Sequence, residues 1–229
     1  MQILGLQKTT LLDYPGHVAA TIFLGGCNMR CPFCHNMNLV NMDSGEQYTQ
    51  EDILAFLSKR KGVLDGVCIT GGEPTIHPEL PDFIRSIKNI GLAVKLDTNG
   101  TNPQMLSTII ENNLVDYIAM DIKSSPKLYG ITCGVPDISI SNIKDSIKLI
   151  MSSGIDYEFR TTIVSEYHTP EAISEIGQLI QGAKHYYLQS FIDSEYVPDH
   201  SLSPLTKDTL IEYKDTLSQY ATHVDIRGV

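Results

Sequence analysis

The 229-residue sequence has no apolar run close to the about 18–20 residues that a membrane helix needs, and residues 1–7 show no signal-peptide pattern. We therefore expect a cytoplasmic protein that does not enter a membrane. The sequence also has few basic residues, with 17 Lys and Arg against 27 Asp and Glu and a formal net charge of −10. This argues against a broad surface for nucleic acid or anionic lipid, although a small basic patch is compatible with it.

The sequence also lacks an even number of cysteines, which a complete set of disulfides would need. The chain has five cysteines, and Cys27, Cys31 and Cys34 fall within one short segment. In a cytoplasmic chain, an odd and clustered set excludes a disulfide framework as the default interpretation.

Internal repeats, low-complexity tracts and long linkers are absent, so we predict one domain over 1–229, with a short segment 1–17 before the first strand. Apolar runs alternate with amphipathic segments. The predicted strands are Val18–Leu24, Val63–Ile69, Leu92–Leu96, Tyr117–Ile122, Tyr157–Val164, Tyr186–Phe191 and Val224–Ile226. Most are continuously apolar, which is typical of strands covered on both faces. The alternation predicts an α/β fold with a parallel sheet and helical crossovers.

Helix start and stop signals lie between these strands. Thr49 with Asp52 predicts the start of a helix over Gln50–Lys59. The other signals are the capping pairs Asn102-Pro103 and Thr169-Pro170, apolar stripes from Ile143 to Met151 and from Leu210 to Tyr220, and the C-terminal glycines Gly91 and Gly154.

The clustered cysteines lie in the segment 27–48, directly after the first of these strands and without a clear element of its own. Loops at the carboxyl ends of parallel strands carry the chemistry in such folds. The spacing C-x3-C-x2-C lets three thiolates converge on a metal centre, and soft sulfur ligands favour zinc, Cu(I) or an iron–sulfur cluster. A four-iron cluster held by three thiolates would leave one iron open to a substrate or cofactor.

Two other interpretations of these thiols stay open. They form a structural zinc site completed by His35 or a distant cysteine, although His35 directly follows Cys34 and is poorly placed as a fourth ligand. Alternatively, they are buried thiols without a metal. Cys68 in an apolar strand and Cys133 in the loop 129–135 are interpreted as bystanders, with a reactive Cys133 as the less favoured alternative.

Phe33 completes the pattern C-x3-C-x-Φ-C, where Φ is aromatic, and this pattern resembles the signature of radical S-adenosylmethionine (SAM) enzymes. The resemblance implies that Cys27, Cys31 and Cys34 hold one 4Fe-4S cluster, that its open iron binds SAM, and that Phe33 lies near the adenine. It also implies a partial (β/α)6 barrel, similar to a TIM barrel but open on one side, which suits the chain length.

The segment Gly71-Gly72-Glu73 follows the second predicted strand. Its glycines expose backbone groups and its carboxylate can accept a hydrogen bond from an amine, but taken alone it is only a turn. After such a cysteine loop it is similar to the GGE motif of radical SAM enzymes. The resemblance implies that Gly71, Gly72 and Glu73 hold the amino group of SAM.

Two acidic motifs, Asp97-Thr98-Asn99-Gly100 and Asp121-Ile122-Lys123, end the next two strands. Oxygen-rich pockets bind hard cations, and a lysine can bind a ribose or a carboxylate. The alternatives without a function are a β-turn for the first motif and a surface ion pair for the second. Both motifs resemble those of glycyl-radical-enzyme activating enzymes (activases). The resemblance implies that Asp97, Thr98, Asn99, Asp121 and Lys123 bind SAM, and that Asp97, Thr98 and Asp121 surround a monovalent cation beside its carboxylate.

Arg160 is a charge inside an otherwise apolar strand, so it needs a partner or a cavity. The matching position in activases is an arginine near SAM. Some activases present a histidine near the sixth strand end, and Gln189 is the predicted substitute here. Arg160 and Gln189 are therefore included among the expected SAM-binding residues.

The segment Asp13-Tyr14-Pro15-Gly16 makes the sequence most similar to the activating proteins of anaerobic ribonucleoside-triphosphate reductase.

The absence of cysteine between Cys34 and Cys68 predicts one cluster only. The resemblance implies an oxidoreductase to which a donor such as flavodoxin or ferredoxin delivers an electron. SAM is then cleaved, and the 5′-deoxyadenosyl radical takes a hydrogen atom from a glycine of a partner glycyl radical enzyme. No catalytic residue beyond the cluster and SAM is expected.

The alternatives are an activase of pyruvate formate-lyase or of another glycyl radical enzyme, and a radical SAM enzyme that acts on a small molecule. A zinc-binding interaction module is the non-enzymatic alternative.

Overall fold

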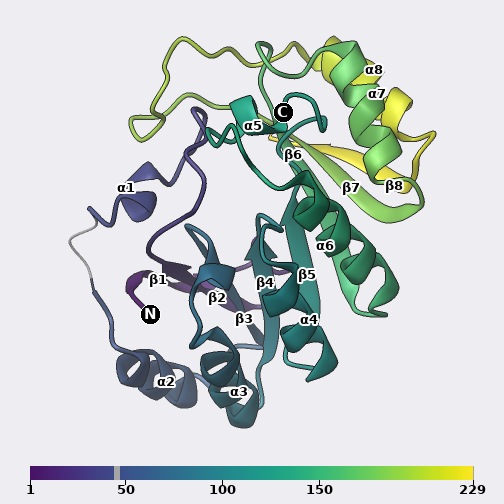
Figure 1. Cartoon of the computed structure of the whole chain (residues 1–229). Coiled ribbons are helices and arrows are strands. Elements are labelled where there is room, and N and C mark those ends of the chain that lie inside the picture. The colour runs from purple at the N-terminus through teal and green to yellow at the C-terminus, as the bar shows by residue number, and fades with distance from the viewer. Residues whose placement is uncertain (44–46, 229) are drawn as a thin grey trace.

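The computed structural model describes residues 1–43 and 47–228. One eight-stranded sheet runs in chain order from β1 to β8; β1 and β2 are antiparallel, and every later pair of neighbours is parallel. Its strands are β1 (Ile3–Thr10), β2 (Ala19–Leu24), β3 (Gly66–Gly71), β4 (Ala93–Thr98), β5 (Tyr117–Asp121), β6 (Asp156–Ile163), β7 (Ala183–Ser190) and β8 (Ala221–Arg227). Among the described strands, β1 and β8 are unpaired edges, so the barrel is open (Figure 1). The predicted open α/β fold is confirmed.

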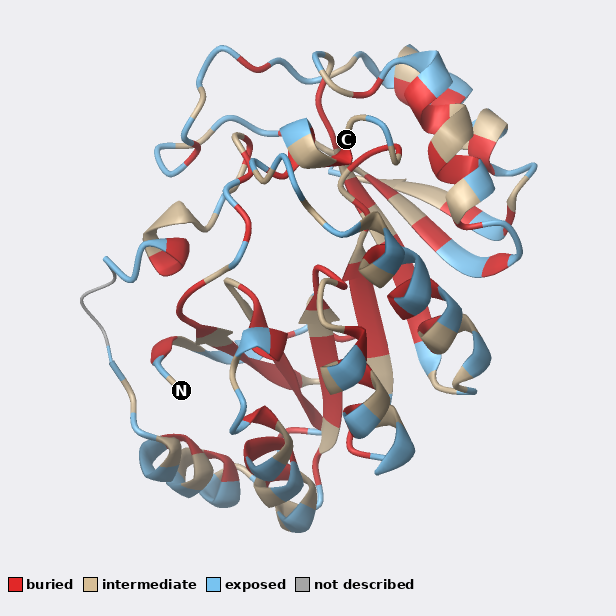
Figure 2. Ribbon diagram, viewed as in Figure 1, coloured by how far each residue is buried: buried red, intermediate tan, exposed pale blue. Residues whose placement is uncertain are grey.

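Helices follow most of the parallel strands and lie along the outer side of the curved sheet (Figure 1). The helices of the described residues are α1 (Met37–Val40), α2 (Gln50–Lys59), the 3-10 helix η1 (Pro74–Ile76), α3 (Leu80–Ile90), α4 (Pro103–Glu111), α5 (Tyr129–Thr132), α6 (Ile140–Ser152), α7 (Pro170–Leu179) and α8 (Lys207–Leu217). Figure 2 shows that the longer helices carry buried residues on one side and exposed residues on the other. The outer layer thus covers the sheet, as crossover helices do.

The predicted helix starts are confirmed in their local geometry. Thr49 and Asp52 form a capping box, in which each backbone N–H donates to the other side chain at 3.1 and 3.0 Å. Asn102 accepts from the Met105 N–H at 3.1 Å, and Thr169 caps α7 in the same way. Gly91 ends α3 with a φ of 95°, a conformation that glycine adopts without a steric penalty.

The strand predictions miss β1 altogether and shorten β8. In β1, which belongs to the segment 1–17, Gln7, Lys8 and Thr9 are exposed at the sheet edge and so interrupt the apolar run on which the prediction relied. Val63 precedes β3 rather than starting it, because its N–H closes a turn onto the Arg60 carbonyl. Cys133 follows the short helix α5 instead of lying in an open loop.

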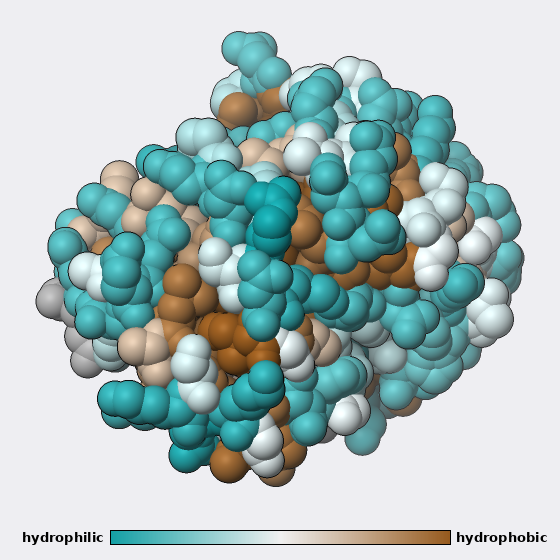
Figure 3. All heavy atoms as spheres, turned by 90° about the horizontal axis from the view of Figure 1, so that it is seen from below, coloured by the Kyte–Doolittle hydropathy of each residue, from teal (hydrophilic) through white to brown (hydrophobic). Residues whose placement is uncertain are grey.

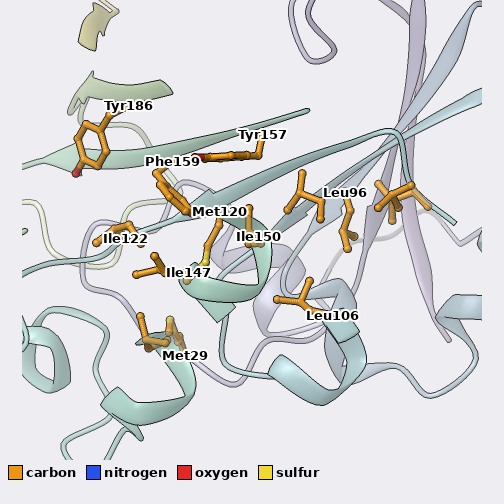
Figure 4. Packing of buried hydrophobic residues seen from close by; sticks show 14 of the residues in the cluster. Met29, Leu96, Leu106, Met120, Ile122, Ile147, Ile150, Tyr157, Phe159 and Tyr186 are labelled. Carbon is orange, nitrogen blue, oxygen red and sulfur yellow. The ribbon is translucent and has the colours of Figure 1, made fainter. Parts of the chain in front are cut away.

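The apolar core lies between the sheet and the helices. Leu96 of β4, Met120 of β5 and Phe159 of β6 project from the sheet and are buried with Leu106 of α4 and Ile147 of α6 (Figure 4). Alternate residues of a strand point to opposite faces, so the residues between these apolar ones face the barrel interior.

The inner face of the sheet carries charged residues on β4 and β6, so these strands are covered on both faces without being apolar on both. Lys95 alternates with Leu96 on β4, and Glu158 and Arg160 flank Phe159 on β6. Lys95 and Glu158 are buried with 2% and 1% of their surface exposed. Charged residues are rarely buried so far unless they are paired, so an ion-pair network is expected inside the barrel.

In the described part of the chain, no helix is long and apolar enough to cross a membrane. Figure 3 shows one face of the molecule, on which hydrophilic groups predominate and hydrophobic groups form smaller patches between them.

Candidate active site

One cavity of about 550 Å³ opens at the carboxyl end of the sheet. All the residues predicted to hold the cluster or SAM line it: Cys27, Cys31, Phe33, Cys34, Gly71, Gly72, Glu73, Asp97, Thr98, Asn99, Asp121, Lys123, Arg160 and Gln189. They come from the ends of β2 to β7, which the parallel topology brings to one edge. The volume lies within the range of cofactor sites.

The cysteine loop is held on both sides by backbone contacts. The Gly26 N–H donates to the Leu39 carbonyl at 2.9 Å, and the Arg30 N–H donates to the Cys133 carbonyl at 2.8 Å. The Arg30 guanidinium also donates to the Cys27 carbonyl at 2.7 Å. These hydrogen bonds hold the loop in place beside the cavity.

Two thiols of this loop, those of Cys27 and Cys31, line the cavity in largely buried positions. Burial raises the pKa of Cys27 to about 11 and that of Cys31 to about 12. A metal must then displace protons from these thiols when it binds. Across the described residues, no three His, Cys, Asp or Glu side chains already surround one metal position. Three thiols from one loop on one cavity nevertheless fit a cluster chemically, and ligation by Cys27, Cys31 and Cys34 stays a prediction.

Among the described residues, neither His35 nor Cys133 is in position as the fourth ligand of the zinc alternative. His35 Nε2 lies 2.7 Å from the Ile192 carbonyl, so that ring nitrogen is engaged away from the thiols. The Cys133 thiol is buried and faces the carbonyls of Gly130 and Val135 at 3.7 and 3.9 Å. A structural zinc site needs a closed set of four ligands.

Two glycines let the loop after β3 pack directly on the cysteine loop. A Cβ at Gly72 would lie 1.8 Å from the Gly26 carbonyl oxygen, and one at Gly71, whose φ is +124°, would lie 2.3 Å from the Leu24 backbone. The Gly72 and Glu73 N–H groups donate to the Leu24 and Gly26 carbonyls, both at 2.8 Å. These glycines are therefore required for the contact between loops, whatever they bind in addition.

Glu73 is buried, and its carboxylate is held rigidly. Oε1 accepts from the Thr75 N–H at 3.0 Å and from the Thr98 hydroxyl at 2.7 Å, and Oε2 accepts from the Asn99 N–H at 2.6 Å. Burial raises its pKa, and these hydrogen bonds act in the opposite direction. A carboxylate has about four acceptor sites, so Oε2 keeps capacity for a cationic amine on the cavity side.

Asp97 and Asp121 are bound by three cationic side chains. Arg160 Nε donates to Asp121 Oδ1 at 2.9 Å, and both terminal nitrogens of its guanidinium lie 3.3 Å from Asp97 Oδ2. Lys123 donates to Asp121 Oδ2 at 3.1 Å, and Lys95 donates to Asp97 Oδ1. The prediction that Arg160 needs a partner is confirmed. The nearby cations hold the pKa of both aspartates well below its usual range, although burial opposes them.

A second ion pair continues this network toward the sheet edge. Arg227 of β8 donates to both carboxylate oxygens of Glu158 at 2.8 Å and lies 3.4 Å above the ring of Tyr187. Tyr117 donates to the same carboxylate at 3.1 Å. Glu158 also lies 3.8 Å from Arg160, so both networks share that arginine.

The ring of Phe33, which lines the cavity, packs on a buried histidine. Its ring centroid lies 6.5 Å from that of His168 and 6.4 Å from that of Tyr167. His168 Nε2 lies 3.0 Å from the Lys123 carbonyl, so His168 joins the aromatic residue of the cysteine loop to the end of β5. Gln189 lines the cavity with Thr162 and Ser190.

Sequence reasoning missed Lys95, Glu158 and His168. Lys95 lies two residues before Asp97, and Glu158 two before Arg160, so each pair shares a strand face. The argument that singled out Arg160, a charge within an apolar strand, applies equally to both of them. His168 precedes the helix-capping Thr169 and carries no such signal.

The fold and this cavity define a radical SAM enzyme, and comparison with known proteins agrees. The model of the Radical SAM superfamily matches residues 21–180, and the chain belongs to this superfamily. A radical SAM methyltransferase from Sphaerobacter thermophilus shares the fold with a TM-score of 0.71 at 14% identity, covering 94% of this chain and 68% of that one.

Sequence relatives place the chain more narrowly. It is 32% identical over 234 residues to a Methanocaldococcus jannaschii protein provisionally named a glycyl-radical enzyme activating enzyme, with coverage of 98% of this chain and 95% of that one. It is 27% identical over 207 residues to the pyruvate formate-lyase-activating enzyme of Clostridium pasteurianum, covering 88% and 83%. Within the superfamily, the chain belongs with the glycyl-radical-enzyme activating enzymes.

Proposed function

We propose that this enzyme uses SAM and one 4Fe-4S cluster to generate a glycyl radical on a partner enzyme. The observation that best supports this proposal is that one cavity is lined by the three thiols of one loop, by the buried Glu73 and by the cationic side chains of Lys123 and Arg160. Its charge distribution suits an amino acid group, because Glu73 offers a carboxylate to the amine and the two cations face a carboxylate. Nearly full-length similarity to activases supports the reaction class.

In this proposal the side chains bind and orient, and they transfer no proton. Cys27, Cys31 and Cys34 hold the cluster, the Gly71-Gly72-Glu73 loop binds the SAM amine, and Phe33 packs against the adenine. Asp97, Thr98, Asn99, Asp121, Lys123, Arg160 and Gln189 form the remaining wall. When bound, the cluster and SAM supply a 5′-deoxyadenosyl radical that takes a hydrogen atom from a glycine. The walls keep water from it.

We propose anaerobic ribonucleoside-triphosphate reductase as the partner, on the resemblance of the segment 13–16, with pyruvate formate-lyase and other glycyl radical enzymes as the alternatives. A flavodoxin or ferredoxin as electron donor, a reducing cytoplasm as location and one domain over 1–229 belong to the same proposal. A monovalent cation also stays a sequence prediction, and the ion pairs of Asp97 and Asp121 argue against it.

The test is anaerobic reconstitution with iron and sulfide, followed by reduction and incubation with SAM and a candidate partner. We expect about four irons per chain and a doublet EPR signal on the partner. The matched control is a partner variant with its radical-bearing glycine replaced by alanine, which should give no doublet. Turnover of a small molecule without a radical on any partner would favour the small-molecule alternative. One tightly bound zinc without SAM cleavage would refute the proposal.

A further inference from the structure

We infer that Lys95 and Arg160 supply, as fixed side-chain cations, the positive charge that a monovalent metal ion was predicted to supply beside the SAM carboxylate. Lys95 is thus a positioning residue for Asp97, and SAM binding needs no added potassium or sodium. The inference rests on the proposed binding of SAM in this cavity.

The carboxylate oxygens of the predicted cation site already have partners. Asp97 Oδ1 accepts from Lys95 and its Oδ2 lies 3.3 Å from two guanidinium nitrogens of Arg160. Asp121 Oδ1 accepts from Arg160 at 2.9 Å and Oδ2 from Lys123 at 3.1 Å. A metal ion that bound both aspartates would either lie close to these side-chain cations, which repel it, or displace them.

The hydroxyl of Thr98, the third predicted ligand, also points elsewhere. It donates to Glu73 Oε1 at 2.7 Å and accepts from the Gly100 N–H at 3.1 Å. The hydroxyl thereby joins the end of β4 to the loop that is proposed to bind the SAM amine. Turning it toward a metal ion would remove a hydrogen bond from a buried carboxylate.

Lys95 has no alternative position once it is displaced. It is 2% exposed, and its ammonium contacts Asp97 and, at 3.8 Å, the thiol of Cys68. Without Asp97 the ammonium would stay buried against a weak acceptor, which is strongly unfavourable. A lysine on the surface could swing into water when a metal ion arrives, but Lys95 cannot.

The charges also balance without a metal ion. Lys95, Arg160 and Lys123 face Asp97 and Asp121, and Glu158 beside Arg160 is balanced by Arg227, so the group has one positive charge in excess. One ligand carboxylate neutralises it. A bound monovalent cation would restore an excess of positive charge next to three fixed cations, in a site where burial weakens dielectric screening.

The experiment measures SAM affinity of the anaerobically reconstituted protein by equilibrium dialysis, in potassium, sodium or tetramethylammonium chloride at equal ionic strength. We expect the three dissociation constants to agree within about twofold, because at equal ionic strength the three salts screen charges equally and none of their cations is needed at the site. Affinity that rises tenfold or so with potassium or sodium over tetramethylammonium would overturn the inference. No SAM binding in any salt would refute the proposed function itself, which distinguishes the two failures.

The variant Lys95→Met removes the ammonium and keeps an unbranched side chain of similar length. In tetramethylammonium we expect SAM to bind about tenfold more weakly, because Asp97 loses one of its buried partners. Potassium or sodium should restore most of that loss by occupying the freed oxygen. A salt-insensitive Lys95→Met protein with wild-type affinity would contradict the assigned role.

The matched control is Lys127→Met, which removes a lysine from a surface pair with Glu175; the Lys127 side chain is 80% exposed. It should behave as wild type in all three salts, since exposed pairs contribute little. If Lys95→Met does not fold, the wild-type comparison of the three salts still decides the inference.

Discussion

Arg160 Nε donates to Asp121 Oδ1 at 2.9 Å, and this bond ties β6 to β5 in the wall of the proposed SAM site. The same guanidinium reaches Asp97 on β4, so one side chain holds two carboxylates at a fixed separation. The planar, forked guanidinium has donors on several sides and can contact both carboxylates in this geometry. A lysine ammonium is a single point charge and cannot reproduce the arrangement.

Replacement of Arg160 by methionine should therefore weaken both the fold and the site. We expect the free energy of unfolding to fall by about 3 kcal/mol, because two largely buried aspartates lose a shared partner. SAM affinity should fall about tenfold or more. Urea denaturation and SAM dialysis under anaerobic conditions measure the two effects. Arg160→Lys keeps the charge without the fork, so it should recover part of the stability and less of the affinity; full recovery of both would show that geometry is irrelevant.

The five cysteines should separate into two groups. Cys31→Ala removes a thiol that lines the cavity, so we expect the reconstituted variant to hold little iron and to cleave no SAM. Cys68→Ala removes a buried thiol from the interior of β3 and should retain iron and SAM cleavage, with a loss of stability of about 1 kcal/mol. Iron analysis and detection of 5′-deoxyadenosine measure both. Equal iron contents in the two variants would contradict the cluster assignment.

Most residues of the cavity were predictable from sequence because they follow apolar strands, and parallel strands end at one edge. That rule places Phe33, Glu73 and Lys123 together, whereas their assignment to the cluster and SAM came from the resemblance. Arg160 and Gln189 lie inside predicted strands and were also included on the resemblance. Lys95 was overlooked because one lysine in the run Ala93-Val94-Lys95-Leu96 hardly changes its hydropathy, and its partner Asp97 becomes a neighbour only on a strand.

The segment Asp13-Tyr14-Pro15-Gly16, on which the predicted partner rests, lies at the opposite end of the sheet. Tyr14 is 2% exposed and packs against Gly66, the first residue of β3. The contact is so close that a Cβ added to Gly66 would lie 2.9 Å from the Tyr14 ring. Asp13 accepts from the Thr21 hydroxyl at 2.5 Å. The segment therefore packs at the amino-terminal end of the barrel and does not line the cavity.

His168 should make stability depend on pH below neutrality. Its Nδ1 accepts from the Val164 N–H at 3.1 Å and its Nε2 faces the Lys123 carbonyl, an arrangement that suits the neutral ring. Burial lowers its pKa below the ordinary value of 6.5. The unfolded chain therefore binds a proton first, and stability is lost as pH falls from 6.5 toward the lower pKa of the folded protein.

Urea denaturation between about pH 7.5 and pH 5.5 should show this loss, on the order of 1 kcal/mol. His168→Gln cannot take up the proton and keeps a donor for the Lys123 carbonyl, so its stability should change less over the same interval. The aspartates of the network have lowered pKa values and stay ionised there, so they do not contribute. Parallel pH profiles for the two proteins would show that His168 is not the titrating group.

Gly72→Ala should separate the cysteine loop from the loop after β3. The added Cβ would lie 1.8 Å from the Gly26 carbonyl oxygen, and backbone on both sides must move to admit it. We expect a loss of about 3 kcal/mol in the free energy of unfolding and a lower affinity for SAM, because Glu73 moves with the loop. Gly154→Ala is the matched control: its φ is +77° and nothing lies within 4 Å of the added Cβ, so only backbone strain of about 1–2 kcal/mol is expected. SAM should bind this control as it binds the wild type. Urea denaturation and SAM dialysis measure both variants, and a Gly72→Ala protein that loses no more stability than Gly154→Ala would show that the two loops are not in the contact described here.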